Sequence, residues 1–212
     1  MERMKLIASL TSPYARKIRV ILLEKALDFE FQNELLADPA NHIADYNPLG
    51  KIPALQTDGG EIFFDSPVIA AYLETLGEEP ALLPGDSLES VRVRQIEALA
   101  DGITDAAVAW LLETRRAPEK QDAGVIAKQS QKVERGLDVL EKKITGQDWL
   151  HGDQFSLADI ATGCCLLWLD FRLASFDWRS RRPALRIRRR SPRTSRRGRP
   201  WRAECRLPRD AR

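Results

Sequence analysis

The sequence predicts an α/β domain followed by an all-helical domain. Short apolar runs of strand length alternate with helical segments in the first part of the chain, whereas only helical periodicity remains in the second part. Between them lies a stretch with several prolines and glycines, which is typical of a linker. We therefore expect one domain over residues 1–78, a linker over residues 79–87 and a helical domain over residues 88–185.

The first strand and the first helix are predicted within the first 25 residues. Residues 5–10 form a short apolar run followed by turn-forming residues, a pattern typical of a buried strand. Ser12 and Pro13 then predict a helix start, because serine caps a helix N-terminus and proline fits the first helical position. The apolar residues that follow recur at helical spacing until about residue 25.

The rest of the first domain supplies three more strands and a second helix. Residues 29–31 alternate like a strand, and residues 52–56 and 62–64 predict two strands around the turn at residues 58–60. The pair Ser66-Pro67 repeats the helix-start signal. The resulting order, β-α-β and then β-β-α, is the thioredoxin-like arrangement.

Three helices are predicted in the second domain. Two long periodic segments cover residues 89–116 and 121–144. A third segment, residues 157–171, is apolar, so we expect it to form a central and buried helix. Ser156 and Asp159 can form a capping box at its start, with Asp in the place of the usual Glu or Gln.

The chain combines an acidic body with a basic end. Residues 1–178 hold 18 basic and 29 acidic residues, a net charge of −11, whereas residues 179–212 hold 15 arginines, no lysine and 2 acidic residues, a net charge of +13. We interpret residues 186–212 as a disordered tail that is read out of frame, because selected basic patches normally mix lysine with arginine. The alternative is a genuine arginine-rich segment that binds RNA or DNA through its phosphates.

Composition also restricts the location and the cofactors. The three cysteines provide neither a disulfide framework nor a metal-binding spacing, and we expect the adjacent Cys164 and Cys165 to be buried and inert. No apolar run is long enough to cross a membrane, and the start of the chain does not resemble a signal peptide. We therefore expect a cytoplasmic protein with no metal and no membrane partner.

Four short motifs together resemble one family. They are Thr11-Ser12-Pro13-Tyr14, Asn47-Pro48-Leu49-Gly50-Lys51-Ile52-Pro53, Asp65-Ser66-Pro67 and Ser156-Leu157-Ala158-Asp159. The combination resembles the bacterial glutathione S-transferases of the serine/cysteine type, within the subgroup that has Thr-Ser-Pro-(Phe/Tyr) after the first strand. This resemblance implies the glutathione S-transferase fold, a thioredoxin-like α/β N-terminal domain plus an all-α C-terminal helical domain.

The resemblance assigns glutathione-binding roles to five residues. Pro53 matches a cis-proline that follows the residue, here Ile52, whose backbone pairs with the cysteine of glutathione; a trans proline at the start of an edge strand is the alternative. Asp65 and Ser66 match the pair that holds the γ-glutamyl end, and Ser66 is also expected to cap its helix. Lys51 either attracts the glycyl carboxylate or is a solvated loop lysine.

Ser12 is the catalytic candidate. Relatives often have Ser or Cys immediately before the Pro-(Phe/Tyr) pair, whereas Thr11 matches the serine used in other branches and is the alternative. A hydroxyl donor at a helix N-terminus would favour the thiolate of glutathione over its thiol. The competing interpretation is that Ser12 only caps the first helix.

The implied function is that of a glutathione transferase in detoxification. The protein would bind glutathione as a co-substrate, stabilise its thiolate and transfer it to an electrophile, or use it to reduce a peroxide. The resemblance also implies a homodimer, in which the first domain of one chain contacts residues 89–116 of the other. The alternative is a non-catalytic interaction module with the same fold. We expect no nucleic-acid partner despite the basic tail.

Overall fold

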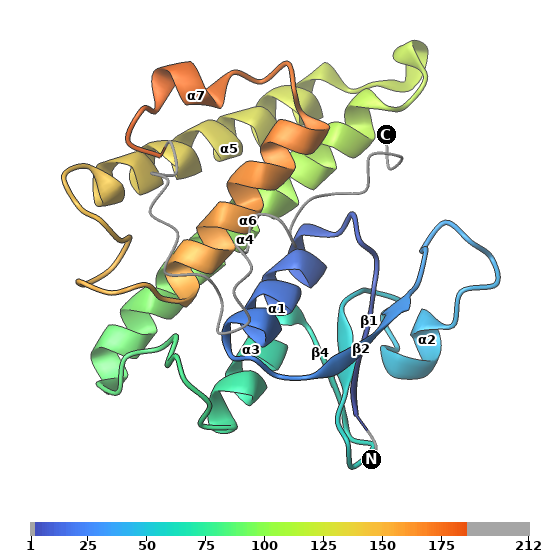
Figure 1. The fold of residues 1–212 in the computed structure, drawn as a ribbon. Helices are drawn as coiled ribbons and strands as arrows, with labels where there is room; N and C mark the ends of the chain where they lie inside the picture. Colours follow the sequence, from blue (N-terminus) through green and yellow to red (C-terminus); the bar gives the residue numbers. More distant parts are fainter. Residues whose placement is uncertain (1–2, 186–212) are drawn as a thin grey trace. The chain divides into compact units, whose positions relative to one another are not determined.

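The computed structural model describes residues 3–185, which divide into two compact units over residues 3–82 and 83–185 (Figure 1). The first unit contains a mixed four-stranded sheet with helices, and the second unit is all-helical. This arrangement confirms the predicted fold class. The interpretation of residues 186–212 as an out-of-frame tail concerns residues that lie outside the described part.

The sheet of the first unit has the strand order β2-β1-β3-β4. The inner strand β1 (Met4–Ala8) pairs in parallel with β2 (Phe29–Asn33) and antiparallel with β3 (Ala54–Gln56), and β3 pairs antiparallel with β4 (Ile62–Phe64). All four strands lie where the apolar and alternating runs predicted them. The parallel pair requires a crossover connection, which the first helix supplies.

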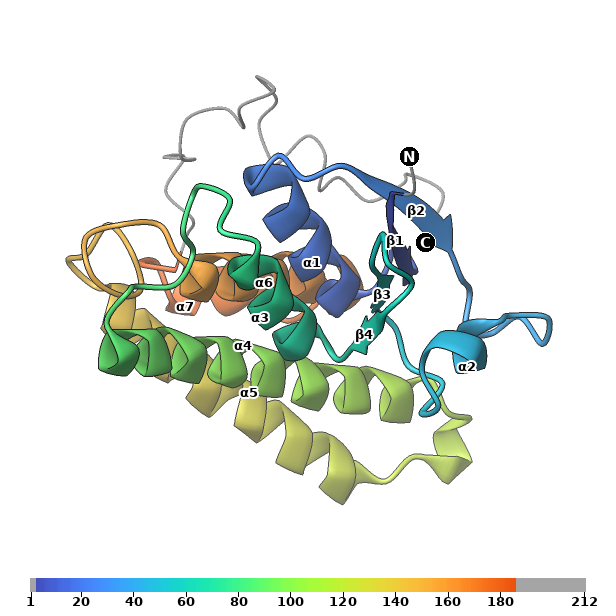
Figure 2. The same ribbon diagram turned by 90° about the horizontal axis from the view of Figure 1, so that it is seen from below.

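Helices cover both faces of this sheet. Figure 2 shows α1 (Pro13–Glu24) and α3 (Ser66–Thr75) on one face and α2 (Ile43–Tyr46) on the other. Ile7 of β1 packs in a buried cluster on the α2 side. Since successive strand residues point to opposite faces, its fully buried neighbour Leu6 points toward α1 and α3. Helix α2 was not predicted, because four residues are too few to show a helical period.

A buried ion pair fixes the end of the first unit. The Lys25 side chain is 1% exposed, and its ammonium lies 2.9 Å from a carboxylate oxygen of Glu74 on α3. The same ammonium donates hydrogen bonds to the carbonyl oxygens of Glu78 at 2.7 Å and Pro80 at 3.0 Å. Since a buried ammonium needs several acceptors, these contacts tie the segment after α3 to the end of α1.

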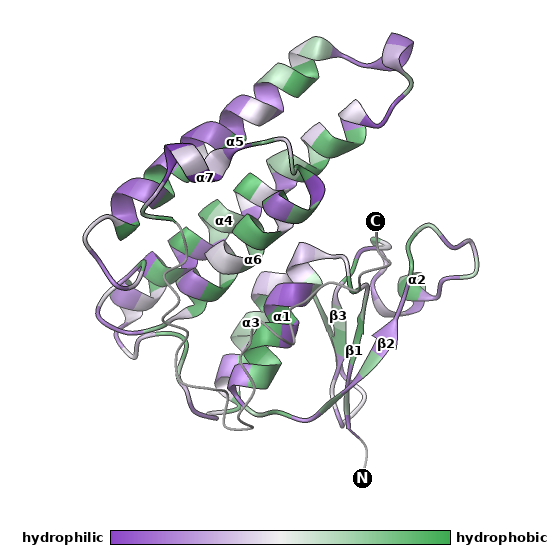
Figure 3. Ribbon diagram, turned by 45° about the horizontal axis from the view of Figure 1, so that its top comes forward, coloured by the Kyte–Doolittle hydropathy of each residue, from purple (hydrophilic) through white to green (hydrophobic). Residues whose placement is uncertain are grey.

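The second unit is built around α4 (Ser87–Thr114), which packs against α5 (Ala123–Ile144) and α6 (Leu157–Arg172). A 3₁₀ turn, η1 (Pro118–Lys120), and a short helix, α7 (Trp178–Arg181), were not predicted. Helix α6 is mostly buried, as expected, and α5 is more hydrophilic than α4 and α6 (Figure 3). Within residues 3–185, no helix has both the length and the apolar character needed to cross a membrane.

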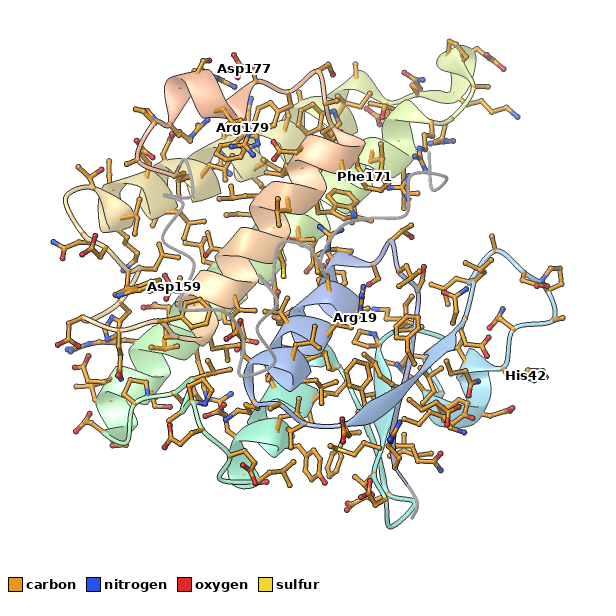
Figure 4. All side chains as sticks on the ribbon, in the orientation of Figure 1. Arg19, His42, Asp159, Phe171, Asp177 and Arg179 are labelled. Carbon is orange, nitrogen blue, oxygen red and sulfur yellow. The ribbon has the colours of Figure 1, made fainter. Side chains whose placement is uncertain are left out.

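The predicted capping box is present at the start of α6. Figure 4 shows Asp159 at this end of the helix. Its carboxylate accepts hydrogen bonds from the Ser156 N–H and hydroxyl, each at 3.0 Å, and from the Leu150 N–H at 3.0 Å. Burial raises the pKa of the Asp159 carboxyl, although these hydrogen bonds act in the opposite direction. The carboxylate thus joins the preceding loop to the buried helix.

Acidic residues of α5 hold the last described residues of the chain. The buried Arg182 guanidinium lies 2.5 Å from a carboxylate oxygen of Glu134 and 2.6 Å from one of Asp138. The Glu141 carboxylate accepts the backbone N–H groups of Ala184 at 2.9 Å and Leu185 at 2.8 Å. The segment that follows α7 is therefore anchored to α5.

Two glycines of the second unit give a matched test of the packing between α4 and α5. A Cβ at Gly136 would clash with Cγ1 of the buried Ile103, whereas a Cβ at Gly102 would meet no atom within 4 Å. Gly136→Ala should lower the free energy of unfolding by about 1–2 kcal/mol, because overpacking outweighs the better helix propensity of alanine. Gly102→Ala should raise it by about 0.5–1 kcal/mol.

Urea denaturation of both variants measures these changes. The same direction of change in both variants would contradict the close contact between Gly136 and Ile103.

Candidate functional site

The register of the sheet brings the predicted site residues to one edge. Ile7 of β1 lies opposite Ala54 of β3, and Ala54 lies opposite Phe64 of β4. The end of β1, the start of β3 and the end of β4 therefore lie side by side. The candidate segments adjoin these strand ends: residues 9–12 follow β1, residues 51–53 precede β3 and residues 65–66 follow β4. All of them belong to the first unit.

Ser12 is the N-cap of α1, as predicted. Its Oγ accepts a hydrogen bond from the Ala15 N–H at 3.2 Å. A hydroxyl has one donor and two acceptor positions, so the hydrogen of Ser12 remains able to donate elsewhere. The Thr11 hydroxyl, in contrast, lies 3.1 Å from Oγ of Ser9, where either oxygen can be the donor. The Ser12 hydroxyl is thus an acceptor in its contact, whereas the Thr11 hydroxyl either donates or accepts.

The Ile52–Pro53 peptide bond is cis, so the alternative of a trans proline is wrong. Pro53 is buried, and the Ile52 side chain packs against the cluster of Ile7, Ile43 and Ala54. Among residues 3–185, no hydrogen bond involves the N–H or the C=O of Ile52. The side chain is therefore anchored, while both polar groups of the backbone can pair with an extended ligand.

Asn47 organises the loop before this proline, a role that the sequence analysis did not assign. It is 2% exposed, its Nδ2 donates to the Lys51 carbonyl at 2.8 Å, and its Oδ1 accepts the Leu49 N–H at 3.0 Å. Its own carbonyl accepts the Gly50 N–H at 2.8 Å. Asn47 was quoted within a motif, but only the fold reveals these contacts. The Lys51 side chain is exposed, which leaves both of its predicted roles open.

Asp65 and Ser66 stand at the start of α3. The N-cap is Asp65, and Ser66 is the first helical residue, so the expectation that Ser66 caps the helix is wrong. The reason is the backbone of Asp65, whose φ of 70° and ψ of 124° lie outside the helical region. Ser66 is 2% exposed, and the backbone N–H groups of the first turn have no partner within the helix.

Asp65 combines strain with exposure. A positive φ is unusual for a residue other than glycine and costs about 1–3 kcal/mol. Its side chain makes no capping hydrogen bond and is exposed, and within the described part of the chain it joins no ion pair. A strained residue whose charge is left available is a feature that recurs at binding sites. Such an arrangement can hold a cationic group.

Other candidate chemistries find no support in the described residues. Within residues 3–185, Cys164 and Cys165 form no disulfide and are buried, as predicted, and burial raises the pKa of the Cys165 thiol to about 12. A thiol of this kind is inert as a nucleophile. Within residues 3–185, no group of three or more histidines, cysteines and carboxylates is placed to hold a metal ion.

Comparison with known proteins matches both units to the same family. Residues 11–76 match the N-terminal domain of glutathione S-transferases, and residues 123–186 match the C-terminal domain of glutathione S-transferases. The chain is 47% identical over 182 residues to YibF of Escherichia coli K12, which is described as an uncharacterized GST-like protein. That match covers 86% of this chain and 90% of YibF.

Solved structures lead to the same family. A glutathione S-transferase from Methylobacillus flagellatus KT with GSH bound is 48% identical, with a TM-score of 0.82, and covers 86% of this chain and 90% of its own. A glutathione S-transferase from Methylobacterium radiotolerans, in complex with glutathione sulfonate, is 37% identical with a TM-score of 0.86 and covers 97% and 95%. With both domains matched and relatives this similar along most of their length, the chain belongs to the glutathione S-transferase family.

Proposed function

We propose that this protein is a glutathione transferase that acts on a small electrophilic or peroxide substrate in the cytoplasm, as a detoxification enzyme of the Thr-Ser-Pro-Tyr type. The observation that carries the proposal is the alignment of Ser12, Ile52-Pro53 and Asp65-Ser66 along one sheet edge. Glutathione-bound relatives that are similar over most of this chain support the same ligand.

The edge offers a matching group for each part of glutathione. The exposed Asp65 carboxylate pairs with the γ-glutamyl amine, while the Ser66 hydroxyl and the first N–H groups of α3 bind the adjacent carboxylate. The N–H and C=O of Ile52 pair with the backbone of the ligand's cysteine, as one strand pairs with another. Lys51 attracts the glycyl carboxylate.

The chemical step needs a stabilised thiolate. The Ser12 hydroxyl donates a hydrogen bond to the glutathione sulfur, and the N-terminus of α1 adds a favourable dipole. Each unit by which the thiol pKa falls corresponds to about 1.4 kcal/mol in favour of the anion. The thiol proton leaves to solvent, the sulfur forms a bond to the electrophilic carbon, and the leaving group departs with its electron pair.

The same thiolate can reduce a peroxide. It attacks the terminal oxygen of a hydroperoxide, which carries the hydrogen, and the O–O bond breaks. The glutathione sulfur becomes a sulfenic acid, and the alkoxide leaves and takes a proton from solvent to become the alcohol. A second glutathione then forms the disulfide and releases water. Because Ser12 offers a hydroxyl where exchange-type relatives have cysteine, this position cannot form a mixed disulfide with glutathione.

Exposed apolar side chains support a homodimer as the working form. Phe64 and Val68 are 37% and 48% exposed on the first unit, and Leu88 and Val91 are 56% and 60% exposed at the start of α4. Paired between two chains, these residues would bury apolar area that a monomer leaves in water. The first unit of one chain would then contact α4 of the other.

Ser12→Ala tests the catalytic assignment. It should lower kcat with an aryl halide or a hydroperoxide by about 10²-fold, because one donor to the developing anion is lost. Binding of glutathione, measured by calorimetry, should stay nearly unchanged. Loss of the helix cap should lower the free energy of unfolding by about 1 kcal/mol.

The matched comparison is Thr11→Ala, which should have the smaller effect on kcat. If Thr11→Ala is the more damaging change, the donor is Thr11 and the assignment is wrong. A wild-type protein that shows neither retention on immobilised glutathione nor a thermal shift with millimolar glutathione would refute the proposed function altogether.

Asp65→Gly tests whether the strained backbone of Asp65 is retained because its carboxylate binds glutathione. Relief of the positive φ should raise the free energy of unfolding by about 1 kcal/mol, after the entropy cost of glycine is subtracted. Loss of the carboxylate should weaken glutathione binding at least about tenfold, because a charge-assisted hydrogen bond is removed. Denaturation and calorimetry measure the two effects.

Two control variants separate the effect of the backbone conformation on stability from the effect of the carboxylate charge on binding. Ala26→Gly relieves another positive φ, of 53°, at the end of α1 and should stabilise the protein with no change in affinity. Asp65→Asn should weaken binding with little change in stability. Equal glutathione affinity in Asp65→Gly, Asp65→Asn and the wild type would exclude Asp65 as the partner of the amine.

Val91→Glu tests the homodimer. Light scattering of the wild type should give the mass of a dimer, and the variant should give a monomer, because a charge would be buried in the contact. Val139→Glu, which changes a 43% exposed valine on α5, should leave the dimer intact. A monomeric wild type would remove the homodimer from the proposal.

A further inference from the structure

The turn between β1 and α1 is held together by Ser9. This residue is 7% exposed and directly follows β1. Its carbonyl accepts the Ser12 N–H at 3.2 Å, which closes a β-turn over residues 9–12. Its Oγ accepts the Thr11 N–H at 3.3 Å and lies 3.1 Å from the Thr11 hydroxyl. One buried serine therefore contacts both residues that carry the candidate hydroxyl groups.

These contacts form a serine turn inside a β-turn. A serine side chain that binds the N–H two residues ahead replaces a backbone turn contact and fixes the local dihedral angles. Without this Oγ, the Thr11 N–H and hydroxyl would both lose their partner. The turn would then be held only by the single backbone hydrogen bond from Ser12 to Ser9.

The position of the Ser12 hydroxyl depends on this turn. Ser12 is fixed from the helix side by the hydrogen bond from the Ala15 N–H and from the strand side by the contact with the Ser9 carbonyl. The first contact orients the side chain of Ser12, and the second fixes its backbone. A displacement of the order of 1 Å is enough to cost about 10²-fold in rate at a reacting centre.

We propose that Ser9 is a positioning residue, which orders the turn over residues 9–12 and thereby aims the Ser12 hydroxyl at the glutathione sulfur. Ser9 also holds the Thr11 hydroxyl in a hydrogen bond in which either oxygen can be the donor. The inference rests on the proposed glutathione transferase function. It adds a residue that makes no contact with the ligand and acts only through its neighbours.

Ser9→Ala in the full-length protein is the decisive variant. It should lower kcat with an aryl halide about tenfold and shift the pH midpoint of kcat upward, because a poorly aimed hydroxyl stabilises the thiolate less. The dissociation constant of glutathione, measured by calorimetry, should stay within about twofold. Ser9→Thr, which keeps the hydroxyl, should restore both kcat and its pH midpoint.

Ser130→Ala is the matched control. Its hydroxyl also makes a local hydrogen bond, to the Ala127 carbonyl at 3.0 Å, but it lies on α5 in the second unit. All parameters should stay at wild-type values. The double variant Ser9→Ala/Thr11→Val should lose less kcat than the product of the two single losses, because both changes disrupt the same contact.

Two results would overturn the proposal. One is a wild-type kcat and pH profile in Ser9→Ala. The other is a joint loss of glutathione binding and of more than about 5 °C in melting temperature, which would make Ser9 a structural residue only.

If the wild type neither binds nor turns over glutathione, the proposed function fails on its own account. The ordering of the turn by Ser9 is then tested by measuring hydrogen exchange at the Thr11 and Ser12 amides. Faster exchange in Ser9→Ala supports the ordering role of Ser9, and equal exchange overturns it.

Discussion

The antiparallel register that joins β1, β3 and β4 is the constraint on which the rest of the first unit depends. Ile7, Ala54 and Phe64 lie in one row across the sheet, and the three candidate segments continue from this row. A slip of one residue in either pairing would turn every side chain of a strand to the opposite face. It would also move the cis-proline away from the turn over residues 9–12. Burial of Leu6, Ile7 and Leu55, each fully enclosed, makes such a slip costly.

The N-termini of the helices show how accurately local structure could be predicted from the sequence alone. The pair Ser12-Pro13 was assigned correctly, because a capping serine before a proline is a local signal with a local cause. The same signal at Ser66-Pro67 was displaced by one residue, since Asp65 adopts a positive φ and takes over the cap position. Aspartate is a favoured N-cap and tolerates a positive φ better than most residues, but its residue type alone does not predict that conformation. The surrounding strand and helix impose it.

Contacts between distant or buried polar groups were the other part that the sequence could not supply. Periodicity located the strands and the long helices, because hydrophobic spacing reports which face is buried. The roles of Ser9 and Asn47 depend instead on the geometry of the turns in which they lie, and a buried serine or asparagine looks like any other turn residue in the sequence. Ser9, which lies outside the recognised motifs, and Asn47, the first residue of one of them, hold the loops that carry the candidate groups.

The anchoring of the last described residues to α5 bears on how the chain tolerates change. Glu141 binds the main-chain N–H groups of Ala184 and Leu185, and these groups are the same for every residue except proline. These two hydrogen bonds are therefore indifferent to which side chains occupy the positions, whereas the buried Leu185 side chain is also constrained by packing. Position 184 can accordingly vary without loss of the contact with Glu141, provided that no proline is introduced.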